Sequence, residues 1–332
     1  MTVGLPDPDT VRAALQLATR APSVHNSQPW LWTIGADTLH LHADTSRHLP
    51  RTDPDQRDLM LSCGAALHHA VVGLAALGFH SRISRLPDPQ NPTHLASIRT
   101  VAQEPAEIDV ALAAAIPRRR TDRRIFSSWV VPRTDIAAIG VRVARMGVQM
   151  RRVDMSTDIE SIVAESVSTH VHDGEYLAEL TMWSGRYAAA AGVPARNTPR
   201  PEPASWLPGR IFAGAALDQP PGTDAAADHA VVLALGTAAD APVDRLRAGE
   251  ATSMALLTCT ALGLASCPVT EPLEIDATRQ AIREEVFGGV EHPQMMLRVG
   301  WAPVGADPLP STPRRALDDV VRSTTRPAAD PA

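Results

Sequence analysis

"LSCGAALHHAVVGLAALG", residues 61–78, is the stretch of sequence that decides the fold. It is almost entirely apolar and rich in small side chains, so we expect a helix over 56–78, buried on most sides and stopped by Gly78. A second stretch, "EATSMALLTCTALGL" at 250–264, has the same character and carries the same Ala-Leu-Gly triplet. The pair indicates an internal duplication, in which two α+β halves pack through closely approaching helices. The alternative is that an alanine-rich composition makes any two helices look alike.

Further helix and strand patterns flank both apolar helices. Residues 8–20 place Val11, Ala14, Leu15 and Ala18 on one helical face. Residues 31–35 and 38–44 alternate like the two strands of a hairpin. The remaining patterns predict helices at 132–144, 157–171 and 275–287, and strands at 94–102, 148–155, 229–237 and 294–302. The sequence therefore predicts an α+β fold with antiparallel or mixed sheets around central apolar helices.

Composition excludes several classes of protein. The chain has 332 residues, 44% of them hydrophobic, and a formal net charge of -6, which argues against a general nucleic-acid binder. All 31 basic residues are arginine, so any cationic site must use Arg or protonated His. The start of the chain lacks the pattern of a signal peptide, and no run of 18 apolar residues predicts a membrane span. Three widely spaced cysteines fit a reduced, cytoplasmic protein.

The first candidate binding stretch is "PSVHNSQPW" at 22–30. Ser23, Asn26 and Gln28 offer donors and acceptors that can read the edge of a planar heterocycle, and Pro22 and Pro29 restrict the backbone around them. The alternative is a capping turn, with Ser23 or Asn26 at the start of the next segment.

The second candidate is "RRRTDRR" at 118–124, which places five arginines in seven residues. Guanidinium groups bind phosphate through paired hydrogen bonds, and Thr121 can add a hydroxyl donor. The alternatives are a solvated linker between the halves or an Arg–Asp surface network. A nucleic-acid patch is disfavoured because no aromatic residues are interleaved with the arginines.

Two further stretches lie in the last quarter of the chain. "SCPVTEP" at 266–272 holds a backbone between two prolines, so that an N–H can point at a ligand. Glu271 in it is a candidate general acid or base, or else a cap for the helix near Ile275. "TPRRALDD" at 312–319 is a second paired-arginine site, or else an exposed helix start. The histidine pairs at 40/42 and 170/172 lack a third ligand at a suitable spacing, so no metal site is expected.

Taken in order, "APSVHNSQPW", "RRRTDRRIF", "ALGLASCPVTE" and "TPRRALDDVV" resemble the nitroreductase-like FMN proteins, and most closely the Acg-type actinobacterial subfamily associated with dormancy. Ordinary members of that superfamily are homodimers with two flavin sites at the subunit interface. Here the motifs of one site are divided between residues 1–116 and 117–332. The resemblance implies a nitroreductase-like fold of two fused halves, a pseudo-dimeric monomer with one complete FMN site between them.

The resemblance also implies which residues contact FMN. They are Ser23, Asn26, Gln28, Pro29 and Trp30 of the first stretch, Arg119, Arg120, Thr121 and Arg123 of the second, Pro268, Val269, Thr270 and Glu271 of the third, and Arg314 and Arg315 of the fourth. Arg119, Arg120, Thr121 and Arg123 are expected at the phosphate or the pyrimidine edge, and Arg314 and Arg315 at the phosphate. Many nitroreductases place Lys beside flavin N1, and here Arg123 or Arg120 would have to replace it.

A proline-rich segment at 192–222, which includes Trp206, departs from the ordinary pattern. A lid there would block nicotinamide and nitroaromatic access to the flavin. The resemblance to the Acg-type subfamily implies weak or absent reductase activity and a role in storing or sequestering flavin. Two functions therefore stay open: an oxidoreductase that uses NAD(P)H to reduce a nitroaromatic or quinone, and a flavin-sequestering protein.

Overall fold

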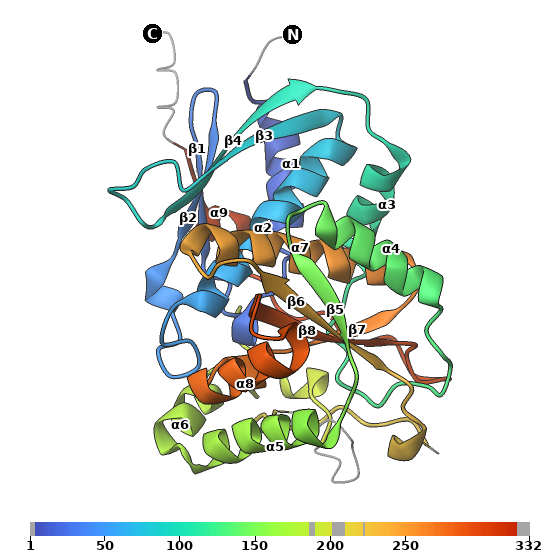
Figure 1. Ribbon diagram of the computed structural model, residues 1–332. Helices are drawn as coiled ribbons and strands as arrows, with labels where there is room; N and C mark the ends of the chain where they lie inside the picture. The colour runs from blue at the N-terminus through green and yellow to red at the C-terminus, as the bar shows by residue number, and fades with distance from the viewer. Residues whose placement is uncertain (1–3, 186–189, 201–209, 222, 324–332) are drawn as a thin grey trace, which may run out of the picture.

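The computed structural model describes residues 4–185, 190–200, 210–221 and 223–323. Figure 1 shows two sheets, one in the upper and one in the lower half of the view, with two long helices between them. The helices are α1 (Pro8–Ala18), α2 (Arg57–Ala76), α3 (Glu107–Ala115), α4 (Arg133–Ala144), α5 (Thr157–His172), α6 (Gly174–Met182), α7 (Pro242–Ala261), α8 (Asp276–Phe287) and α9 (Leu317–Val320). The strands are β1 (Trp30–Ile34), β2 (Leu39–Ala43), β3 (Phe79–Arg85), β4 (His94–Ala102), β5 (Gln149–Val153), β6 (Val231–Thr237), β7 (Ala265–Val269), β8 (His292–Gly300) and β9 (Val321–Ser323).

Each sheet is formed almost entirely by strands from one part of the chain. The first has the strand order β3-β4-β2-β1-β9 and the second the order β5-β6-β8-β7. All pairs are antiparallel except β1 with β9, where Trp32 lies opposite Val321 in a parallel register. The α+β class with antiparallel and mixed sheets is therefore confirmed. The division at residue 116 stays a prediction, and the end of the chain returns to complete the first sheet.

The central helices α2 and α7 pack in unusually close contact, as their small residues predict. A Cβ added to Gly64 would lie 2.1 Å from the Leu246 carbonyl oxygen, and one added to Gly249 would lie 2.1 Å from that of Leu61. No side chain fits in either place, so both positions need glycine. Gly78, with φ of 91°, follows α2 and ends it as expected.

Helix α2 is a core helix of this fold. Its length and apolar composition would also suit a membrane span, and it is the one helix of the described residues for which that holds. In the folded chain 83% of its most apolar window is buried, against α1, α3 and α7 among others. Two fully buried tryptophans of β1, Trp30 and Trp32, belong to the same core cluster. The apolar surface of α2 is thus satisfied within the protein.

Most predicted elements are present, and the differences have physical causes. The patterns missed β3, β7 and β9, together with α3, α6 and α9. Strand β3 alternates between half-buried and exposed residues, so its polar sequence lacked a continuous apolar signal. Helix α7 begins at Pro242, eight residues before the predicted start, because its first turns carry charged residues and Pro occupies the first helical position.

Candidate functional site

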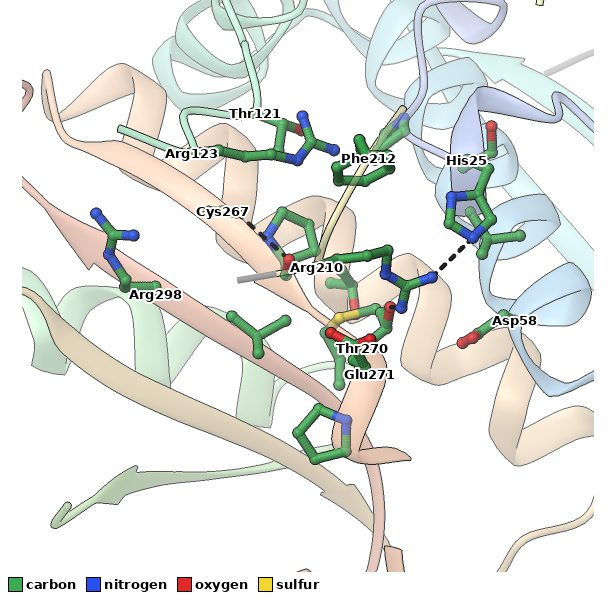
Figure 2. Close-up of a pocket in the computed structure, with 18 of the residues that line it drawn as sticks. His25, Asp58, Thr121, Arg123, Arg210, Phe212, Cys267, Thr270, Glu271 and Arg298 are labelled. Atoms are coloured by element: carbon green, nitrogen blue, oxygen red, sulfur yellow. Dashed lines mark hydrogen bonds between the residues drawn. The ribbon is translucent and has the colours of Figure 1, made fainter. Parts of the chain in front are cut away.

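A cavity of about 380 Å³ is lined by three of the four stretches singled out in the sequence, 22–30, 118–124 and 266–272. Figure 2 shows His25 and Asp58 on one side of it, and Thr270, Glu271 and Cys267 near the end of β7. Helices α2 and α7 supply an apolar wall that includes Leu61, Ala65 and Leu256. This size falls in the range of small-molecule and cofactor sites.

A second, smaller cavity of about 70 Å³ adjoins the first. Five arginines of the described part of the chain line it, which are Arg20, Arg119, Arg120, Arg123 and Arg314. The two cavities share five lining residues, namely Pro22, Ser23, His25, Thr121 and Arg123. Among the described residues that line the smaller cavity there is no aspartate or glutamate. The two arginine clusters of the sequence, 118–124 and 314–315, therefore meet at one small, positively charged space.

Two of these arginines, the buried Arg119 and the partly buried Arg314, have no carboxylate partner within the described residues. Arg119 is 6% exposed, and its Nε and Nη1 form no hydrogen bond within the described residues. Burial lowers the pKa of Arg119 to about 10 and that of Arg314 to about 9, and the neighbouring arginines add to both effects. A buried, uncompensated charge is costly unless it is paired. An anion in the smaller cavity would supply the missing partner.

The turn at 23–28 holds the C-terminal arginine segment in place. Asn26 accepts a hydrogen bond from Arg314 Nη1 at 2.9 Å, and its amide donates to the carbonyl oxygens of Gly192 and Pro313 at 3.0 Å each. Gln28 Oε1 accepts from the Arg315 backbone N–H at 2.8 Å. His25, Asn26 and Gln28 all have positive φ, of 44°, 54° and 54°. Asn and His adopt that region more readily than Gln does, and such backbone strain clusters at functional sites.

Eleven of the fifteen predicted site residues line one or both cavities. They are Ser23, Asn26, Arg119, Arg120, Thr121, Arg123, Pro268, Val269, Thr270, Glu271 and Arg314. Gln28, Pro29, Trp30 and Arg315 do not line either cavity. Trp30 begins β1 and faces the core, while Arg315 pairs with Asp44 at 3.1 Å and so is already neutralised. Gln28 and Arg315 instead join the turn to the C-terminal segment through hydrogen bonds.

The arginines of 118–124 divide into distinct groups. Arg124 is buried and pairs with Asp122 at 2.8 Å, so this Arg–Asp pair is internal rather than a surface network. Arg118 is exposed. Arg119, Arg120 and Arg123 line the smaller cavity. Periodicity could not separate these roles, because the segment is irregular and each side chain's direction depends on the tertiary fold.

Sequence reasoning missed several residues of the larger cavity. His25 lies inside the quoted first stretch, and its position between chemically active neighbours was a usable signal. Arg210 and Phe212 come from the proline-rich segment, where nothing marked them individually. Arg210 donates to Thr270 Oγ1 at 3.2 Å and pairs with Glu274, and the Arg123 guanidinium lies 4.8 Å from the Phe212 ring centre. Trp206 and residues 201–209 lie outside the described residues.

Among the described residues, two carboxylic acids, Asp58 and Glu271, line the larger cavity. Burial raises the pKa of Asp58, although Arg57 lies 2.8 Å away and opposes the shift. The prediction that Glu271 caps the helix near Ile275 is wrong: Ile275 is the N-cap of α8 and no side chain caps it. Glu271 Oε1 instead lies 3.1 Å from His170 Nδ1, because the chain makes a short turn at 271–273 before α8. No metal-binding cluster is found in the part of the chain that the structure describes.

Comparison with known proteins finds similar chains in Mycobacterium tuberculosis, strain H37Rv. The chain is 56% identical over 321 residues to "Putative NAD(P)H nitroreductase Rv3131", which covers 97% of this chain and 93% of that protein. It is 36% identical over 322 residues to "Putative NAD(P)H nitroreductase acg", with 94% and 95% covered. No protein-family model matches the chain. The similarity to both mycobacterial proteins thus extends over nearly the full length of each.

Two solved structures are also similar. One is a Bacteroides fragilis nitroreductase with bound FMN, 15% identical with a TM-score of 0.41, covering 62% of this chain and 95% of that one. The other is the FMN-dependent nitroreductase NfnB of Mycobacterium smegmatis in complex with NADPH, 16% identical with a TM-score of 0.37, covering 67% and 100%.

Proposed function

The chain belongs to the nitroreductase-like family that includes these mycobacterial proteins, and from that premise we propose that it is a flavoprotein that binds one FMN between its two halves. The observation that carries this proposal is the junction of the two cavities. The larger has mainly apolar walls, whereas the smaller has five arginines and no carboxylate among its described lining residues. FMN has the matching form, a planar ring joined to a doubly charged phosphate.

The residues divide naturally along such a ligand. Arg119, Arg120 and Arg314 would hold the phosphate, since Arg119 in particular has unpaired N–H groups to offer. Ser23 and the strip Pro268–Glu271 would face the ring. Bound FMN supplies a centre that takes electrons from reduced nicotinamide and passes them to a small acceptor.

Arg123 is the better candidate to replace the lysine that many nitroreductases place beside flavin N1. It lines both cavities, whereas Arg120 lines only the smaller one. Burial lowers the pKa of Arg123, and the one side-chain hydrogen bond found for it among the described residues goes to the Asn197 carbonyl oxygen at 3.3 Å. Its charge is therefore free to act on a ligand.

We expect the purified protein to be yellow and to bind FMN at a ratio of one per chain. Flavin fluorescence titration of the stripped protein, combined with the visible spectrum, measures both quantities. A ratio of two would contradict the single site, and a colourless protein that does not bind added FMN would contradict the proposed function as a whole.

The finer proposal is that residues from 192–222 cover the flavin, so that generic nitroreductase activity is low. Arg210 supports this, because it contacts His25 of the first half and both Thr270 and Glu274 of the second. Arg210, Ile211 and Phe212 all line the larger cavity. Flavin storage is the extreme form of this proposal, and an active NAD(P)H-dependent reductase of nitroaromatics or quinones is the alternative. Cytoplasmic localisation and a monomeric state stay predictions.

Replacing Arg210 with alanine should release this cover and speed reduction of the bound flavin by NADH or NADPH at least tenfold. Anaerobic stopped-flow mixing, followed at the flavin band, measures the rate. Arg12→Ala is the matched control, since Arg12 forms an exposed ion pair with Asp318. An unchanged rate in the Arg210 variant would exclude the cover. Rapid reduction of the wild-type flavin with steady turnover of a quinone would favour the alternative.

A further inference from the structure

His25 lies at the junction of the two cavities. It lines both of them, and it is 6% exposed. Its Nε2 lies 2.7 Å from Arg210 Nη1, a contact drawn as a dashed line in Figure 2. The ring also meets Phe212 edge-on, with ring centres 5.9 Å apart.

The contact with Arg210 fixes where the imidazole proton sits. A guanidinium group can only donate, so His25 Nε2 must accept and cannot carry a hydrogen. The Thr52 hydroxyl, 3.4 Å from the same nitrogen, donates its own hydrogen to Glu179 Oε1 at 2.7 Å and therefore does not compete. A neutral imidazole with an occupied lone pair on Nε2 carries its hydrogen on Nδ1.

The surroundings keep the ring neutral. Burial holds the pKa of His25 well below its ordinary value, and the positive charges of Arg210 and Arg123 act in the same direction. Glu179 is the carboxylate behind Thr52, and its hydrogen bonds go to Thr52 and the Arg51 backbone rather than to the ring. Protonation would place a hydrogen on Nε2 directly against Arg210, so the neutral form persists.

We propose that Arg210 locks His25 as its neutral Nδ1–H tautomer, so that the ring presents a permanent hydrogen-bond donor to an uncharged oxygen of the ligand that fills the cavities. The other ring nitrogen, Nδ1, forms no hydrogen bond within the described residues. Because His25 lines both cavities, the acceptor lies between the anion-binding end and the ring-binding end of that ligand. His25 thereby complements Arg123, which supplies charge at the same junction.

The tautomer can be tested without any ligand. In ¹⁵N-histidine-labelled protein, long-range ¹⁵N–¹H spectra should show His25 with its hydrogen on Nδ1, and no titration between neutral pH and pH about 5, below the ordinary histidine pKa. Replacing Arg210 with methionine frees Nε2, so the His25 signals should change to the other tautomer or begin to titrate. A hydrogen on Nε2 in the wild-type protein, or a charged ring at neutral pH, would overturn the proposal.

A matched pair of variants tests the donor itself. The side-chain amide of His25→Asn falls near the position of Nδ1, so it keeps a donor for the ligand and loses the contact with Arg210. The side-chain amide of His25→Gln falls near the position of Nε2, so it keeps the contact with Arg210 and loses the donor for the ligand. Glutamine tolerates the positive φ of this position, since Gln28 and Gln56 of this chain already have positive φ. With FMN as the probe, the glutamine variant should bind about five- to tenfold more weakly, as for loss of one neutral hydrogen bond, and the asparagine variant within about threefold of wild type.

If the asparagine variant bound FMN more weakly than the glutamine variant, His25 would serve only to hold Arg210, and the proposed donor role would be wrong. This part rests on the proposed function, because it uses FMN. If the wild-type protein fails to bind FMN, the proposed function fails, while the tautomer still stands or falls by the ligand-free spectra.

Discussion

Replacing Arg119 and Arg314 together with methionine is expected to weaken FMN binding by about 2–4 kcal/mol, or roughly 30- to 1,000-fold in Kd. Both side chains line the smaller cavity, and neither has a carboxylate partner within the described residues; Arg119 is buried and Arg314 partly buried. Methionine keeps much of the side-chain volume, so the loss reports on the charge and its hydrogen bonds. Fluorescence titration of the stripped variant measures the constant.

The single variant Arg119→Met should be more stable than wild type when no ligand is bound, because the Nε and Nη1 of Arg119 form no hydrogen bond within the described residues, whereas Arg314 donates to Asn26 and to backbone oxygens. Removing the buried Arg119 charge relieves a desolvation cost, by about 1–4 kcal/mol as in buried ionic clusters replaced by apolar residues. Urea denaturation of the stripped proteins measures this difference. A site that is destabilised alone and stabilised by its ligand is what an anion-binding pocket requires.

Arg315→Met is the matched control for the phosphate assignment. Arg315 neighbours Arg314 in sequence, yet it pairs with Asp44 and lies outside both cavities. We expect its replacement to change the FMN Kd by less than about threefold, since its charge is already neutralised by Asp44 and it lines neither cavity. A large loss with Arg315→Met, or none with the Arg119/Arg314 variant, would contradict the placement of the phosphate.

Replacing Gly249 with alanine is expected to lower the free energy of unfolding by about 3–5 kcal/mol. The new Cβ would lie 2.1 Å from the Leu61 carbonyl oxygen and 2.8 Å from its carbonyl carbon, both of them backbone atoms of α2. No rotamer change can relieve that overlap, so α2 and α7 must move apart. Helix propensity alone predicts the opposite sign, about 1 kcal/mol in favour of alanine. Urea denaturation measures the change.

Gly174→Ala is the control for this effect. Gly174 begins α6, and a Cβ added there has no neighbour within 4 Å. We expect stability to stay the same or to rise by up to about 1 kcal/mol. If Gly249→Ala were as stable as Gly174→Ala, the close approach of the central helices would be wrong.

The predictable part of the fold has a common physical origin. Apolar periodicity found α1 and the β1–β2 hairpin, because these elements bury one face against a core and their residues must repeat accordingly. Helix α2 was found as a nearly continuous apolar run, because it is buried on most sides. Elements such as β3 and α6 were not predicted from the sequence, because neighbours from distant parts of the chain decide which of their residues are buried. The first eight residues of α7 were not predicted as helical, because the charged residues in its first turns resemble a loop.

The candidate site divides in the same way. Chemistry-bearing residue types at close spacing marked 22–30, 118–124, 266–272 and 312–319 in advance. Spacing could not show that the Arg315 side chain pairs with Asp44 while the Arg314 side chain lines the cavity. The two residues are adjacent and identical in type, so only the direction of each side chain in the fold separates their roles. It also could not reveal that Arg210 contacts His25 from 185 positions away in the chain.

The sequence by itself determined the kind of protein: which residues could meet an anion and a planar ring, and that small-residue helices would lie at the centre. Local patterns carry that information, because burial and charge act on each residue type wherever it falls. Only the tertiary structure decided which arginines remain unpaired, which are neutralised, and which nitrogen of His25 faces Arg210. Those outcomes depend on distances between segments far apart in the chain, and packing alone sets such distances.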